Sequence, residues 1–119
     1  MALIDWQYSR RASKPEEYVL IIVTGYMHVE RADLAQFLRD LQVLASATRQ
    51  RVGNISYDAA VDDPQAGRLL ISERWSDQSA LSAHLDAPDT VAFVRRWQER
   101  MRGQIRKYDA SNERDLTEV

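Results

Sequence analysis

The sequence predicts an α+β fold, a ferredoxin-like antiparallel sheet of four strands with its helices on one face. Three observations lead to this prediction. Segments with strand and helix patterns follow one another in the order β-α-β-β-α-α-β, the connections between them are short, and one long segment has a clean helical period. The chain has 119 residues, enough for one domain with a core of its own.

The first strand is predicted at residues 18–27, YVLIIVTGYM, because β-branched and aromatic side chains dominate this segment. Leu20 and Ile22 point to one face of such a strand, and Ile21 and Val23 point to the other. A strand that is apolar on both faces is buried on both faces. The helices of this chain can cover one face, so we expect a partner or a ligand to cover the other.

A long amphipathic helix is predicted at residues 32–51. Its polar side includes Asp33, Gln36 and Arg39. Apolar or small residues recur at three- and four-residue steps on the side that should face the sheet: Leu34, Phe37, Leu38, Leu41, Leu44, Ala45 and Thr48. Gly53 is expected to follow the end of this helix as its C-terminal stop.

A hairpin follows the long helix. Residues 54–61 alternate between two faces, as a half-buried strand does, and residues 62–67, DDPQAG, have the composition of a turn. Residues 68–75 are the second strand of the hairpin.

Two helices and a last strand complete the predicted fold. Ser76 or Asp77 is expected to cap a short helix that runs to about residue 86. Pro88 begins a further helix over residues 88–103, which Gly103 would close. The inner face of that helix is predicted to carry Val91, Val94, Trp97 and Met101. Residues 104–110 form a weak last strand.

The predicted domain occupies residues 18–110. Residues 1–17 are interpreted as an N-terminal extension, and residues 111–119 as a polar C-terminal tail. Trp6 and Tyr8 suggest that part of the extension docks on another surface, because disordered segments are poor in aromatic residues.

Composition excludes several classes of function. The chain has no cysteine, which removes disulfides, thiolate nucleophiles and cysteine-ligated metal sites. The net charge is −2 with both signs interspersed, so no basic footprint for nucleic acid is present. The longest apolar run, YVLIIV, is far shorter than the ~20 residues that cross a bilayer. We expect a cytoplasmic protein with no membrane and no nucleic-acid partner.

One carboxylate stands out, because Glu73 shares a strand face with Leu69, Ile71 and Trp75, and His84 follows shortly after. A buried carboxylate needs a partner, since burial without one costs several kcal/mol or raises its pKa. Glu73 is therefore expected to pair structurally, through His84 as one possibility, or to act as a base.

Several segments together resemble the antibiotic biosynthesis monooxygenase (ABM) domain family: TRQRVGNISYDAAVDD, SERWSDQSALSAHLDAP and AFVRRW. The resemblance extends from about residue 18 to residue 108. The positions that match the family pattern are Arg49, Gly53, Tyr57, Glu73, Trp75, Ala80, Leu81, His84 and Phe93. Two positions depart from it, since the family commonly has a Glu at the position of Arg51 and often a Cys at that of Asn54. The identity of a substrate therefore cannot be carried over.

The resemblance implies a homodimer of the dimeric α/β barrel type, in which two sheets pack face to face. Such a dimer would cover the second apolar face of the first strand. The resemblance also implies a cofactor-independent monooxygenase that oxidises an aromatic, phenolic or quinol-like small molecule with O2 as co-substrate. No flavin and no metal is expected.

The candidate catalytic residues are His84 and Glu73. For His84, a packed histidine and a proton carrier are both open interpretations, because imidazole titrates near neutral pH. A metal site is not expected, since His28 is the only other histidine. The candidate substrate-binding residues are Trp75, Tyr57, Asn54 and Arg49, whereas Trp97 is expected in the core.

Other functions stay open. The same fold in a non-catalytic role would bind a small apolar ligand in the dimer, for example as a stress-related protein. Some relatives of the family degrade haem with a strand Asn, a Trp and a His. Trp75 and His84 could serve in that role, but YVLIIVTGYM contains no Asn.

Overall fold

The computed structural model describes residues 19–119. The predicted N-terminal extension at residues 1–17, with Trp6 and Tyr8, lies outside the described residues. The elements occur in the predicted order, with one short 3-10 helix in addition: β1 (Leu20–Val29), η2 (Arg31–Asp33), α1 (Leu34–Thr48), β2 (Asn54–Asp63), β3 (Arg68–Trp75), α2 (Gln78–Asp86), α3 (Pro88–Trp97) and β4 (Met101–Ala110).

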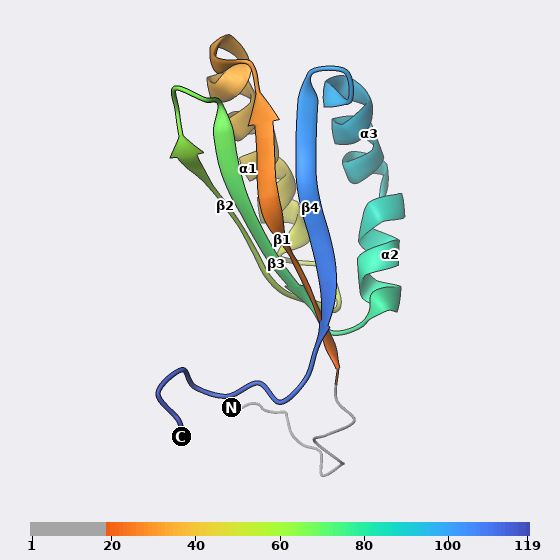
Figure 1. The fold of residues 1–119 in the computed structure, drawn as a ribbon. Coiled ribbons are helices and arrows are strands. Elements are labelled where there is room, and N and C mark those ends of the chain that lie inside the picture. The colour runs from red at the N-terminus through yellow and green to blue at the C-terminus, as the bar shows by residue number, and fades with distance from the viewer. Residues whose placement is uncertain (1–18) are drawn as a thin grey trace.

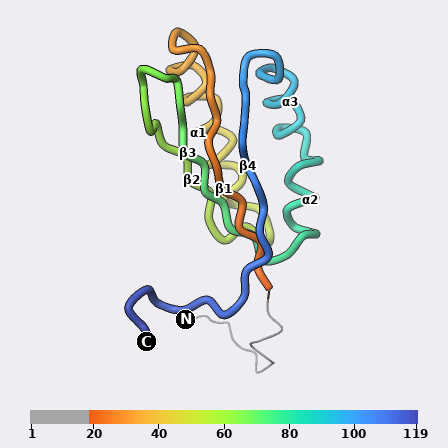
Figure 2. The backbone as a smooth tube through the Cα atoms, viewed as in Figure 1, coloured from red at the N-terminus to blue at the C-terminus, as the bar shows by residue number. Residues whose placement is uncertain are grey.

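The four strands form one antiparallel sheet in the order β2-β3-β1-β4. Figure 1 shows the helices on one side of this sheet, with α1 behind the central strands and with α2 and α3 along the β4 side. The predicted ferredoxin-like α+β fold is thus confirmed. The tube in Figure 2 shows that residues 111–119 leave the sheet beyond the end of β4, and this tail contains no helix or strand. No helix in residues 19–119 is long and apolar enough to cross a membrane.

Strand register places the candidate residues on the face of the sheet that the helices cover. Trp75 pairs with Ile21, and Glu73 lies between Val23 of β1 and Tyr57 of β2. All five side chains are buried. The sequence left open which face Trp75 and Tyr57 occupy, and the structure puts both of them beside the helices.

The inner face of α1 is the one that the helical period predicts, with Phe37, Leu41 and Ala45 in the core. Gly53 follows the helix with a positive φ of 87°. A Cβ atom at this position would lie 2.3 Å from the Cβ of Ala80. Glycine is therefore needed both for the backbone conformation and for the close approach of α2 to the junction between α1 and β2.

The structure identifies the residue that caps α2, and it shows that α3 is shorter than predicted. Asp77 caps α2, since its Oδ1 accepts a hydrogen bond from the Ala80 backbone N–H at 2.8 Å. The prediction that α3 extends to Gly103 is wrong, because α3 ends at Trp97. Met101 and Gly103 instead pair with Val29 and Met27 of β1. Pairing with an open strand edge satisfies the backbone groups that a longer helix would otherwise have bonded internally.

The buried face of α3 also differs from the predicted one. Thr90 and Trp97 are buried and Phe93 packs against the core, whereas Val94 is 40% exposed. Trp97 lies in the core as predicted, with its ring edge-on to Phe37 at a centroid distance of 5.0 Å. Its indole N–H donates to Asp40 Oδ2 on α1 at 2.9 Å, which ties the two helices together.

Candidate functional site

His84 is the centre of the candidate site. It lies on the inner face of α2 and is only 3% exposed. Its imidazole stacks on the indole of Trp75, with ring centroids 4.9 Å apart and 29° between the planes. Tyr57 approaches the same imidazole edge-on at 5.9 Å. Aromatic rings from two strands therefore enclose a histidine that a helix supplies.

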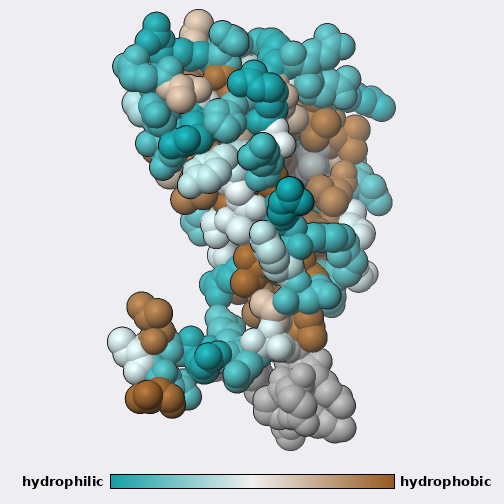
Figure 3. Space-filling view, viewed as in Figure 1, coloured by the Kyte–Doolittle hydropathy of each residue, from teal (hydrophilic) through white to brown (hydrophobic). Residues whose placement is uncertain are grey.

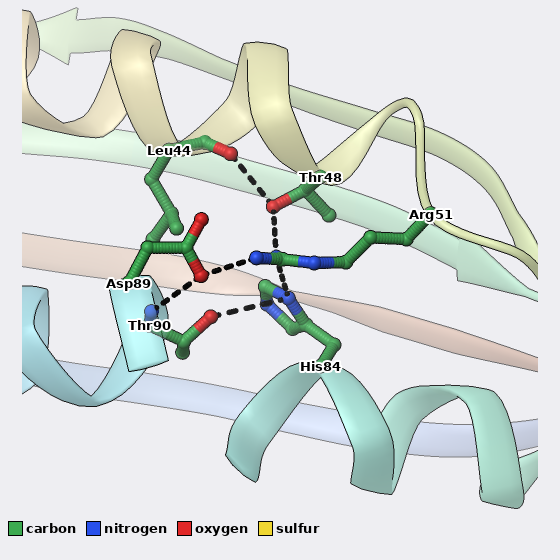
Figure 4. A network of polar contacts seen from close by, with 6 residues as sticks. All are labelled: Leu44, Thr48, Arg51, His84, Asp89 and Thr90. Atoms are coloured by element: carbon green, nitrogen blue, oxygen red, sulfur yellow. Dashed lines mark hydrogen bonds and ion pairs between the residues drawn. The ribbon is translucent and has the colours of Figure 1, made fainter. Parts of the chain in front are cut away.

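Arg51 joins this histidine to a network of polar contacts, shown in Figure 4. Its Nη1 lies 2.7 Å from His84 Nδ1 and donates to Thr48 Oγ1 at 2.9 Å. Its Nη2 donates to Asp89 Oδ1, so that the two side chains also form an ion pair. Thr90 Oγ1 lies 3.3 Å from His84 Nδ1. The network connects the end of α1 with α2 and the first turn of α3.

Glu73 is hydrogen-bonded to Trp75 and not to the network around Arg51. Its Oε1 accepts a hydrogen bond from Trp75 Nε1 at 2.9 Å, and its side chain is 7% exposed. Trp75 itself is fully buried. One tryptophan therefore contacts both candidate catalytic residues, the imidazole with its face and the carboxylate with its N–H.

Burial shifts the pKa values at the site. Burial, with a further contribution from the positive charge of Arg51, lowers the pKa of His84 from 6.5 to about 4. Burial also raises the pKa of the Glu73 carboxyl, although the hydrogen bond from Trp75 offsets part of this effect. The pKa of the Tyr57 phenol is raised by burial and by the nearby charge of Glu73. All three groups are held toward their neutral forms.

Asp89 shows the opposite behaviour. Burial alone would raise the pKa of its carboxyl, but the hydrogen bond and the charge of Arg51 outweigh that effect and lower it. Arg51 therefore has a charged carboxylate on one side and a neutral imidazole on the other.

The structure brings four of the six predicted site residues together: His84, Glu73, Trp75 and Tyr57. The hypothesis that Glu73 and His84 share a hydrogen bond is wrong. Glu73 bonds Trp75, and His84 contacts Arg51 and Thr90. The reason is the stacked Trp75 ring, whose N–H is the donor for the carboxylate.

Arg49 and Asn54 make contacts with the backbone of β2 instead. Arg49 Nε donates to the carbonyl of Tyr57 at 2.9 Å, and its Nη2 lies 4.0 Å from Asp58. Asn54 Nδ2 donates to the carbonyl of Ser56 at 3.1 Å, where the pairing of β2 with β3 shifts register. These bonds fix the start of β2, which carries Tyr57.

Sequence reasoning missed the residues around Arg51. It noted Arg51 as a departure from the family pattern, and it gave Asp89 and Thr90 no role. One signal was present, since Arg51 departs from the family pattern beside Gly53. Thr48 was recognised on the inner face of the helix, but its hydroxyl was not singled out as a polar group.

Within residues 19–119, no group of three or more His, Cys, Asp or Glu side chains is arranged to hold a metal ion.

Comparisons with known proteins agree on one family. A protein of Bacillus subtilis (strain 168) named "Putative monooxygenase YcnE" is 25% identical over 80 residues, which cover 67% of this chain and 84% of that protein. A Deinococcus radiodurans crystal structure, described as "a putative antibiotic biosynthesis monooxygenase", superposes with a TM-score of 0.74 at 25% identity. The match covers 82% of this chain and 99% of that one.

A structure from Bacteroides thetaiotaomicron has the same fold, with a TM-score of 0.71 at 18% identity over 78% of this chain and 99% of that one. The model of the family described as "Antibiotic biosynthesis monooxygenase" matches residues 20–96, from β1 to α3. That range contains every residue of the network in Figure 4. This chain belongs to the antibiotic biosynthesis monooxygenase (ABM) family.

Proposed function

We propose that this protein is a cofactor-independent monooxygenase that oxidises an aromatic, phenolic or quinol-like small molecule with O2. The observation that carries the proposal is the arrangement around Trp75. A buried imidazole stacks on its ring, and a buried carboxylate accepts its N–H. Aromatic surface with a few convergent polar groups is what recognition of a planar phenol requires. Membership of the ABM family supports the oxidative chemistry.

A substrate of this class supplies its own electrons. When the CH2 group of an anthrone-type phenol becomes C=O, one oxygen atom of O2 enters the product and the other leaves as water. The substrate gives up all four electrons that this reduction of O2 needs, so the proposal requires no flavin, haem or metal. The task of the protein is to take a proton and to hold the electron-rich anion.

Glu73 and His84 are the groups that act on the substrate in this proposal, and Trp75 and Tyr57 supply its aromatic surface. A carboxylate whose pKa is raised by burial is a stronger base than an exposed one, and so it is better suited to accept a proton from the substrate. Arg49 and Asn54 keep a supporting role at the edge of the substrate site, through their hydrogen bonds to β2.

We also propose that the protein is a homodimer, built on the sheet face that the helices leave bare. Figure 3 views the molecule from this side and shows polar and apolar residues mixed on its surface. Tyr26 and Leu70 lie beside each other on neighbouring strands, 41% and 42% exposed. A stable dimer of standard size would bury roughly 1,600 Å² in total.

Charges on the same face suggest how two copies would meet. Asp58 lies on β2 at one edge of the sheet, and Arg106 lies on β4 at the other. Both belong to one cross-strand row with Ser72 and Thr24. A two-fold axis along the strands places β2 of one copy over β4 of the other, so that Asp58 faces the partner's Arg106. An axis across the strands that passes through this row would place each of these charges opposite its own copy.

The oxidation is tested with the purified chain and anthrone-type and quinol substrates, by recording O2 uptake and the absorbance spectrum of the protein before substrate is added. Uptake without added cofactor, with one atom of labelled O2 in the product, is the expected result. A Soret band in the untreated protein would indicate haem chemistry instead.

A cytoplasmic location is part of the proposal, since a chain without cysteine gains nothing from an oxidising compartment.

A non-catalytic protein that binds a small apolar ligand is the alternative. The network in Figure 4 favours this alternative, because Arg51 already contacts Thr48, His84 and Asp89 and these groups have partners within the protein. Ligand binding without O2 uptake for any substrate of this class would decide for it.

A further inference from the structure

We propose that Arg51 is a positioning residue that fixes His84 in one tautomer, with its proton on Nε2. His84 then serves as a hydrogen-bond donor to an oxyanion of the substrate, and Glu73 takes the proton. The proposal deepens the proposed monooxygenase function and rests on it for the identity of the substrate, but its first half concerns this chain alone. The geometry around Nδ1 carries the assignment of the tautomer, and the donor role of Nε2 follows from it together with the proposed function.

A guanidinium group can only donate hydrogen bonds. Because Arg51 Nη1 lies 2.7 Å from His84 Nδ1, this nitrogen must offer its lone pair. Thr90 Oγ1, at 3.3 Å from the same nitrogen, is a second potential donor. With Nδ1 as acceptor, the single proton of a neutral imidazole resides on Nε2.

The direction of the other bonds in the network agrees with this assignment. The Thr48 hydroxyl donates to the carbonyl of Leu44 at 2.7 Å, so its oxygen is left to accept from Arg51 at 2.9 Å. Asp89 accepts from the other terminal nitrogen of Arg51. Figure 4 shows the guanidinium between these groups, held from α1 and α3. Its orientation is thus determined without His84, and it imposes the tautomer on the histidine.

A second proton on His84 would have to go to Nδ1, directly against the cationic guanidinium. The charged or titratable groups that face His84 from the packed elements are Arg51, Asp89 of α3 and Tyr57 of β2, with Glu73 of β3 beyond Trp75. Burial and Arg51 lower the pKa of His84 to about 4, and the opposing effect of Asp89 is smaller. His84 is therefore a neutral donor at physiological pH and a poor base.

The substrate that suits such a donor bears its negative charge on oxygen, as a phenolate or an enolate does. In the proposed step, the substrate O–H or adjacent C–H bond breaks and an O–H bond forms on the Glu73 carboxylate. The electron pair stays on the substrate, and its oxygen accepts the hydrogen bond from His84 Nε2. The charge thus remains with the molecule that reduces O2.

The tautomer is measured by long-range 1H–15N NMR on protein labelled with 15N-histidine, with His28→Gln to assign the signals. Wild type is expected to show His84 protonated on Nε2 alone from pH 8 down to pH 5. Arg51→Lys, which still has only donors, should keep this pattern. Arg51→Glu should move a proton to Nδ1 and raise the pKa of His84 by about 2 units. Arg95→Glu, the same charge change at an exposed position of α3, should leave both unchanged.

If Arg51→Glu does not fold, the double variant Arg51→Glu/Asp89→Lys is used in its place, because it reverses the ion pair instead of breaking it. A proton on Nδ1 in wild type, or an unchanged tautomer in both of these charge-reversal variants, would overturn the role of Arg51. This result does not depend on any enzymatic activity.

The donor role of His84 is tested with a dinitrophenol that is ionised at pH 7 and with its methyl ether, which cannot ionise. Binding is followed by tryptophan fluorescence. Wild type should bind the phenolate at least about tenfold more tightly than the ether, and His84→Phe, which keeps an aromatic ring but has no donor, should lose this preference. Equal binding, or binding of neither probe, would overturn the donor role. Binding without O2 uptake would contradict only the monooxygenase proposal.

Discussion

The imidazole of His84 lies flat against the indole of Trp75, at a centroid distance of 4.9 Å, while the N–H of the same indole bonds Glu73. Trp75 therefore links two polar groups that do not contact each other through a hydrogen bond. Its position is determined by the register of β3 against β1, where it pairs with Ile21. A substitution at Trp75 therefore acts on the imidazole and on the carboxylate at once.

Replacing Trp75 with Phe should leave the Glu73 carboxylate buried without its donor. We expect the free energy of unfolding at pH 7 to fall by about 1–3 kcal/mol, the cost of an unsatisfied buried group. Urea denaturation measures the change. In a Glu73→Gln background the same substitution should cost less, because a neutral amide is easier to bury than a carboxylate. Equal costs in both backgrounds would mean that the ring, and not the hydrogen bond, accounts for the loss.

Stability should fall in mild acid because of His84. Its pKa is 6.5 in the unfolded chain and about 4 in the folded one, so between these values the unfolded chain binds more protons. This contribution to stability is fully present above pH 6.5 and is lost as the pH falls toward 4, with a total of about 3 kcal/mol at most. Denaturation curves at a series of pH values measure the slope.

Two variants isolate this effect. His84→Phe removes the titrating group and should flatten the slope between pH 6.5 and pH 4, whereas His28→Gln removes the other histidine and should retain it. A slope that persists in His84→Phe would assign the acid sensitivity to carboxyl groups such as Asp89, whose pKa is lowered in the folded state by Arg51.

Glu73→Gln should separate stability from activity. Because the folded-state pKa of Glu73 lies above its ordinary value of 4.5, its contribution to stability is present at low pH and is lost as the pH rises through the folded pKa. The glutamine variant should therefore be more stable than wild type at pH 8, and by less at pH 4. If Glu73 is the proton acceptor, turnover should fall by about a hundredfold or more. Full turnover in this variant would remove Glu73 from the chemistry.

His84→Ala distinguishes catalysis from support. The alanine removes both the stacked ring and the Nε2 donor, so turnover in the proposed reaction should fall by about a hundredfold. His84→Phe restores the ring without the donor and should regain stability but not turnover. If His84→Ala keeps full turnover and only loses stability, His84 connects the sheet and α2 without a role in the chemistry.

The fold could be predicted because its signals are local. The α1 period placed Phe37 and Leu41 in the core, and alternation in β3 placed Glu73 and Trp75 on one face; the structure confirms both. The end of α3 could not be predicted in this way, because Met101 continues a helical period by coincidence and the competing contact is a strand far away in the sequence.

The geometry of the candidate site also depends on contacts between residues that are far apart in the sequence. Arg51 and His84 are separated by 33 positions, and Arg51 and Asp89 by 38. No spacing rule connects a helix C-terminus to the first turn of a helix so far along the chain. The partner of Glu73 was missed for a different reason. The pairing of Glu73 with His84 was predicted because a carboxylate and an imidazole commonly bond each other. Trp75, two residues after Glu73 in the same strand, has a buried indole N–H that also needs an acceptor, and it bonds Glu73 instead.

The dimer proposal predicts which substitutions separate two copies. Leu70→Glu places a charge in the middle of the bare sheet face and should convert a dimer into a monomer, as light scattering at micromolar concentration would show. Val43→Glu is the matched control, because Val43 is 73% exposed on the outer side of α1 and should leave the dimer intact. Asp58→Arg and Arg106→Asp should each weaken the dimer by placing like charges opposite each other, and the double variant should restore it. Weakening that the double variant does not reverse would exclude a two-fold axis along the strands, and a wild-type monomer would remove the proposal.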